Sequence, residues 1–176
     1  MPSALPDLYV RFENRFLAGV PAEQAWQARV GLRVSWSTLP WALLFVALFT
    51  YIESPLLTAS LAIVLGVFAG APFLIRWRKD TRLFGHVLVA GWVQALCLPS
   101  WLLGGLLSAC FAWLAMCALL ATVYTGRRGG LAWSAVVSAI AVGFYIAHVT
   151  GVLPPPIVPP ETLWLLAVAA HVALFG

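Results

Sequence analysis

Charged residues are scarce in this chain, and they are absent from the long stretches that make up most of it. Only 9% of the 176 residues are charged, whereas 62% are hydrophobic, and the mean hydropathy is +0.96. A water-soluble domain of this size could not bury so much apolar surface in one core. Helices of about 20 apolar residues can instead cross the ~30 Å hydrocarbon layer of a bilayer. The composition therefore predicts a membrane protein whose main partner is the lipid bilayer.

The sequence also has few cysteines and lacks the combinations of residues that are typical of catalytic sites. The three cysteines, Cys97, Cys110 and Cys117, all lie in apolar runs and form no C-x-x-C pair. This excludes an even disulfide framework and argues against a metal site. No orienting carboxylate accompanies a Ser, Cys or His inside the apolar runs, so no nucleophilic site is predicted. We expect no catalytic residue, metal ligand or bound cofactor in these residues, and whether the whole protein is an enzyme stays open.

The first 33 residues carry charges at short intervals and lack an apolar core, so no cleavable signal peptide is expected. Apolar side chains alternate with these charges, which predicts a cytosolic segment over residues 1–33 with an interfacial helix that Pro21 divides. The net charge of +4 does not indicate a nucleic-acid partner. The basic residues flank apolar segments, where they orient the chain in the membrane.

Residue 34 begins a series of apolar segments that extends to the end of the chain. Residues 83–126 form 44 consecutive uncharged positions, far too many for one crossing at ~1.5 Å per residue. This run must fold back on itself, and Gly104-Gly105 is the expected hairpin. The pattern predicts an all-α, six-helix membrane bundle over residues 34–176, with spans at about 34–52, 56–75, 83–103, 106–125, 131–151 and 161–176.

The basic residues predict how this bundle sits in the membrane. All ten Lys and Arg residues fall within residues 11–33, 76–82 or 127–128, whereas the opposite connections hold only Glu53 and Glu161 as charges. The positive-inside rule then places both termini in the cytosol. The sixth span has only 16 residues and no terminal basic anchor, so we expect a cytosolic continuation after residue 176, with a natural short tail as the alternative.

Polar residues inside the predicted spans narrow the choice of function. No Asp, Glu, Lys or Arg lies well inside a span, which disfavours a transporter that uses a charge relay. His86 is predicted near the cytosolic face, His148 near the outer face and His171 near the midplane, and these unequal depths disfavour bis-histidine haem. His86 and His148 are expected to be interfacial and in contact with water.

Gln94 and His171 reach the midplane from opposite directions, and they define a predicted ligand pocket between the third, fourth and sixth spans. A buried Gln or neutral His can orient a ketone, hydroxyl or amide on a lipophilic molecule. The alternative is a hydrogen bond between helices without a ligand. Residues at helical spacing extend the two faces outward or form a third wall. The predicted site residues are Gln94, Cys97, Trp101, Cys110, Trp113, Cys117, Trp164 and His171.

Small residues recur at four-residue spacing on two predicted spans, which permits close approach between helices. The second span carries Ala62, Gly66 and Gly70, and the fifth carries a similar series over residues 135–147. Packing inside the bundle is one interpretation, and a homodimer contact through the second span is the other.

The predicted topology resembles the six-span sensory domains at the N-terminus of bacterial histidine kinases and nucleotide cyclases. Cys97-Leu98-Pro99 with Trp101 is similar to the third-span segment of the receptor kinases that detect α-hydroxyketone autoinducers. Gly104-Gly105 falls where RegB-type redox-sensing kinases carry a Gly-Gly-x-x-Asn-Pro-Phe quinone motif. Residues 108–110 here are Ser, Ala and Cys instead, which argues against quinone binding.

This resemblance implies a sensor in the bacterial inner membrane. We therefore expect a receptor module that binds a small lipophilic signal, works as a homodimer and relays the signal through the sixth span to a cytosolic kinase or cyclase. A self-contained membrane transporter or cofactor protein, with quinone or haem, is the leading alternative, and a membrane enzyme is the third.

Overall fold

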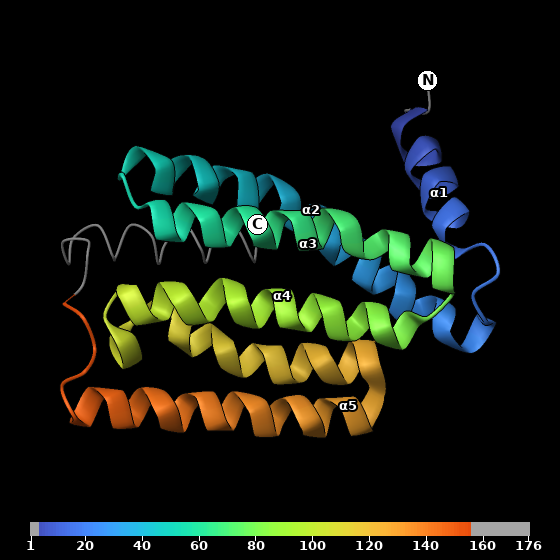
Figure 1. Ribbon diagram of the computed structural model, residues 1–176. Coiled ribbons are helices and arrows are strands. Elements are labelled where there is room, and N and C mark those ends of the chain that lie inside the picture. The colour runs from blue at the N-terminus through green and yellow to red at the C-terminus, as the bar shows by residue number, and fades with distance from the viewer. Residues whose placement is uncertain (1–3, 156–176) are drawn as a thin grey trace.

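A computed structural model describes residues 4–155 of the chain. Helices α2 to α5 lie along a common axis, each antiparallel to the one before it, and α1 crosses that axis steeply at one end (Figure 1). No strand occurs within residues 4–155. The elements are α1 (Ala4–Leu17), α2 (Ala22–Tyr51), α3 (Pro55–Arg78), α4 (Thr81–Leu102), the 3-10 turn η1 (Gly105–Leu107) and α5 (Ala109–Val149).

The longest helix, α5, is folded back on itself at one residue. Gly126 has φ 77° and ψ −178°, a conformation that interrupts the helix and that glycine adopts readily. The halves before and after it, residues 109–125 and 127–149, run side by side in opposite directions (Figure 1). A Cβ on Gly130 would lie only 2.1 Å from Thr122 Oγ1, so the missing side chain allows the return. We call residues 126–130 the elbow.

The described helices have the dimensions of membrane spans. Four of them, α2, α3, α4 and the Cys110–Val149 part of α5, are long and apolar enough to cross a bilayer. In lipid such segments are helical because every backbone polar group must be satisfied within the segment. The predicted all-α membrane protein is confirmed to this extent. The two halves of α5 correspond to the fourth and fifth predicted spans, whereas the sixth, 161–176, lies outside the described residues.

The predicted turns and helix ends agree with the structure, with one difference. Gly104 and Gly105 have φ of 112° and 64°, and they form the expected hairpin between α4 and α5. The chain also breaks between α1 and α2, where Pro21 precedes the first residue of α2. However, residues 22–33 do not form a separate interfacial element; they continue directly into the first span, because no helix-breaking residue separates them from it.

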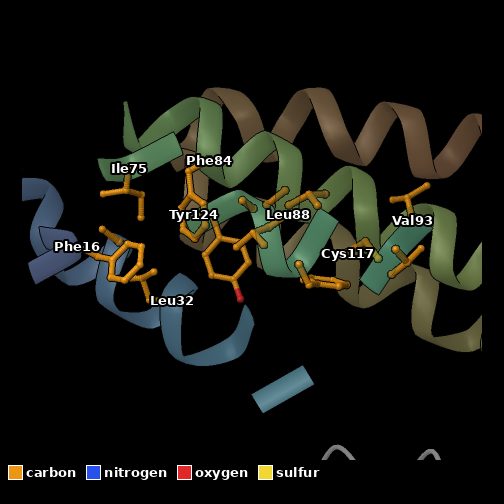
Figure 2. Packing of buried hydrophobic residues seen from close by; sticks show 14 of the residues in the cluster. Phe16, Leu32, Ile75, Phe84, Leu88, Val93, Cys117 and Tyr124 are labelled. Carbon is orange, nitrogen blue, oxygen red and sulfur yellow. The ribbon is translucent and has the colours of Figure 1, made fainter. Parts of the chain in front are cut away.

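The core lies where all five helices meet (Figure 2). Each helix contributes a large buried side chain, namely Phe16, Leu32, Ile75, Leu88 and Tyr124 from α1 to α5 in order. Phe16 packs edge to face against Trp36 at 5.6 Å, so α1 is part of the packed structure.

The two ends of the bundle differ in the charge of their residues. The α3–α4 connection, the elbow and the α1–α2 connection lie at the same end, which we call the basic end (Figure 1). It gathers the basic residues of segments 76–82 and 127–128. The opposite end holds the α2–α3 connection, η1 and residues 150–155, where Glu53 is the charged residue among those described.

Candidate functional site

An apolar groove of about 410 Å³ lies at the opposite end of the bundle, between the end of α4 and the second half of α5. Its volume is in the lower part of the range of ~300–1,000 Å³ that small-molecule sites occupy. The groove is open at the surface, and no charged side chain lines it. The lining residues are Trp101, Ile140, Gly143, Phe144, Ile146, Ala147, Thr150 and Val152.

Two aromatic rings, those of Trp101 and Phe144, line this groove, and Phe111 packs against Phe144. The ring centroid of Phe144 lies 5.7 Å from that of Trp101 and 5.4 Å from that of Phe111, with interplanar angles of 67° and 58°. Tilted contacts of this kind are favourable for aromatic pairs. The cluster joins α4 to both halves of α5.

Next to these rings, the groove has free space and one hydroxyl. A Cβ on Gly143 would meet no atom of the described residues within 4 Å, so larger side chains at this position would extend into open space. Thr150 Oγ1 donates to Ile146 O at 2.8 Å, which occupies its proton but leaves lone pairs on the oxygen. The groove therefore suits an uncharged, mainly apolar molecule that can donate one hydrogen bond.

The residues predicted to bind a ligand are spread over several environments. Trp101 is half-buried and lines the groove. Cys117 is 1% exposed in the core, and half-buried Cys97 packs against the same core. Gln94 is exposed on α4. Cys110 and Trp113 are half-buried on the first half of α5, and Trp164 and His171 lie outside the described residues.

The groove thus shares only Trp101 with the predicted set, and a pocket that includes the sixth span remains a prediction. Sequence reasoning did not identify Ile140, Gly143 and Phe144 as possible site residues. Their spacing contained a signal, because positions 140, 143, 144 and 147 fall on one helical face. The small residues on that face were interpreted only as packing positions.

Polar contacts at the basic end hold α1 in place. The Glu13 side chain is 3% exposed, and its Oε1 lies 2.7 Å from Arg29 Nε in an ion pair whose angle is poor for a hydrogen bond. Its Oε2 accepts hydrogen bonds from Arg33 at 3.2 and 3.3 Å. The connections are also tied together, because Lys79 Nζ donates to Ala18 O and Thr81 Oγ1 donates to Gln24 Oε1.

One side-chain hydrogen bond joins α4 to the second half of α5. Trp133 Nε1 donates to His86 Nδ1 at 3.0 Å, so the neutral imidazole carries its proton on Nε2. His86 and His148 are both exposed, and they belong to opposite ends of the bundle; their contact with water at the two membrane faces stays a prediction. Within residues 4–155, no three His, Cys, Asp or Glu side chains come together to hold a metal ion.

Comparison with known proteins gives no relative: no family model, no curated protein and no solved structure matches this chain.

Proposed function

We propose that this chain is a membrane sensor module that binds a small lipophilic molecule in the groove between α4 and the second half of α5. The observation that carries the proposal is the Trp101–Phe144 wall beside the space at Gly143. Such a site takes its ligand from the lipid phase or from the membrane surface, and its one hydroxyl orients a polar group. An uncharged molecule with an apolar body fits it best.

Lack of charge within the described spans favours a receptor over an ion-coupled transporter. Transporters of that kind place ionisable or unwound backbone groups near the midplane. In α2 to α5 the Lys, Arg, Asp and Glu residues lie in the end turns, in residues 22–33 or at the elbow. The groove can thus hold an uncharged ligand. The described spans, however, provide no row of charged side chains along which an ion could cross the bundle.

The position of the groove along the chain offers a route by which ligand binding could act on the predicted sixth span. Residues 140–152 line it, and the segment that leads to the predicted sixth span begins just after them. In our proposal, ligand in the groove beside Trp101 and Phe144 alters the spacing of α4 and the second half of α5. The sixth span carries this change to a cytosolic histidine kinase or nucleotide cyclase, with both termini in the cytosol and the module in the bacterial inner membrane.

The proposed assembly is a homodimer through α3. Ala62, Gly66 and Gly70 are exposed, and a Cβ at either glycine would meet no atom of the described residues within 4 Å. The series on α3 is therefore available for close contact with a second helix, which supports the intermolecular interpretation over packing inside the bundle.

Photocrosslinking with a long-chain α-hydroxyketone that carries a diazirine tests ligand binding. We expect crosslinks to Trp101 and to residues 140–152 in the purified full chain, and competition by the unmodified ketone. Gly143→Leu fills the groove and should abolish the competed signal, as should Trp101→Ala. Ser138→Leu, which places the same side chain at an exposed position of the same helix, should leave it unchanged.

Each variant is compared only after circular dichroism and gel filtration show that it is folded. Competed crosslinking that persists in both Gly143→Leu and Trp101→Ala would rule out the groove. Loss in Gln94→Leu alone would instead place the ligand in the pocket predicted from the sequence.

A further inference from the structure

The basic end carries a second surface, which is separate from the groove. His86 on α4 lies against the elbow and the helix that follows it: its Cε1 lies 3.4 Å from where a Cβ on Gly129 would be, and it accepts the hydrogen bond from Trp133. Arg82 is exposed one helical turn before His86, on the same face of α4. Arg82 at the start of α4 therefore lies at the same end of the bundle as Arg127 and Arg128 of the elbow (Figure 1).

These three guanidinium groups are not neutralised by the described acids. The two ion pairs within residues 4–155 both belong to Glu13, which Arg29 and Arg33 occupy. Asp80, next to Arg82 in the chain, accepts from Leu83 N at 2.9 Å as the cap of α4. Glu23 lies on the first turn of α2, and Asp7 lies on α1. The elbow thus presents a surplus of positive charge.

An exposed apolar strip continues from the arginines along the second half of α5. Leu131 is 63% exposed, and Ala135 and Ala139 follow it at four-residue spacing, both exposed. Trp133 lies on another face of the helix, and its indole N–H is bonded to His86. Positive charge at the end of the bundle, followed by an apolar strip directed toward the bundle centre, matches a phospholipid in charge and in polarity.

We propose that the elbow binds an anionic phospholipid, with its phosphate among Arg82, Arg127 and Arg128 and an acyl chain along Leu131, Ala135 and Ala139. The inference does not depend on the ligand groove, which lies at the other end of the bundle. It requires only that the end of the bundle lies at the level of the lipid headgroups. A lipid bound there holds the two halves of α5 against α4, because it contacts α4 and the elbow together.

The test is retention of phosphatidylglycerol by the purified full chain, measured by native mass spectrometry against phosphatidylcholine. A basic residue near the headgroups contributes about 1 kcal/mol, which is about fivefold in affinity. Arg127→Gln with Arg128→Gln should therefore weaken phosphatidylglycerol binding by about 25-fold. Binding of phosphatidylcholine should stay unchanged. The matched control is Arg76→Gln with Arg78→Gln, which removes the same charge at the same end of the bundle and should change phosphatidylglycerol binding little.

Leu131→Gln distinguishes binding of a phospholipid from binding of a free phosphate, because only the phospholipid would contact the apolar strip. We expect this variant to weaken phosphatidylglycerol binding while binding of glycerol phosphate stays as weak as in the wild type. Equal losses in the two double variants would show nonspecific charge attraction and overturn the proposal. Binding of inorganic phosphate as tight as that of the lipid would also overturn it. Variants are compared at equal helicity, so that unfolding is not read as lost binding.

Discussion

Gly85 lies where α4 packs closely against α5, and its replacement by alanine should separate them. A Cβ at this position would lie 2.8 Å from Thr125 Cγ2 and 2.9 Å from both the Cβ and the carbonyl oxygen of Tyr124. Two of these atoms cannot move away by side-chain rotation, because one is the backbone oxygen and the other is fixed to the backbone. The helices must therefore shift, and the contacts of buried Phe84 and Tyr124 shift with them.

The magnitude follows from two opposing terms. Inserting a methyl group into a packed core costs about 1–3 kcal/mol. Alanine in place of glycine favours the helix by up to about 1 kcal/mol. Gly85→Ala should therefore lower the free energy of unfolding by about 0.5–2 kcal/mol. Gly66→Ala is the matched control, because its Cβ would meet no described atom within 4 Å. This control should be neutral or slightly stabilising.

The assay is denaturant-induced unfolding of both variants in the same detergent, followed by far-ultraviolet circular dichroism. A lower midpoint for Gly85→Ala, together with an unchanged or higher midpoint for Gly66→Ala, is the expected pair of results. If Gly85→Ala were as stable as the wild type, α4 and α5 would not cross at this glycine. Destabilisation by Gly66→Ala instead would mean that residue 66 contacts another helix, either inside the bundle or in the proposed dimer.

Three other substitutions test separate parts of the structure. Glu13→Gln should release α1, because it removes both ion pairs to α2. The expected loss in the free energy of unfolding is about 1–3 kcal/mol, since Glu13 is buried and its two arginine partners are half-exposed. Spin labels on α1 and α2 should show a broader distance distribution, and an unchanged distribution would refute the role of Glu13 in holding α1. Tyr124→Phe removes a buried hydroxyl that makes no hydrogen bond to the described residues, so stability should stay level or rise by about 1 kcal/mol, and a clear loss would reveal a partner. Gly70→Leu should weaken self-association in analytical ultracentrifugation without loss of helicity, because nothing described fills that space; unfolding would contradict a dimer face.

The turns of this fold could be predicted because specific residues require them. Gly104 and Gly105 both adopt positive φ, and a 44-residue uncharged run had to reverse somewhere. At the elbow the sequence predicted a connection around Arg127 to Gly130, but a single residue, Gly126, makes the break. Glycine pairs show where a chain reverses more reliably than they show which residue breaks the helix.

The candidate site was harder to predict than the fold. Counting residues gave the depth of Gln94 along α4, but depth does not fix which way a helix turns about its own axis. Because α4 is apolar on most of its faces, hydrophobic periodicity does not distinguish the exposed face that holds Gln94 from the buried face that holds Leu88. The groove depends further on how Phe144 meets Trp101 across two helices, which is a property of packing.

A cytosolic output domain requires the basic end of the bundle to face the cytosol, and single-cysteine labelling in intact cells measures this directly. In a background without the three native cysteines, Cys at Arg78 or Arg127 should be protected from a membrane-impermeant maleimide until the cells are permeabilised. Cys at Ser54 or Val152 should react at once. Labelling at Arg127 together with protection at Ser54 would invert the orientation and contradict a sensor that signals to the cytosol.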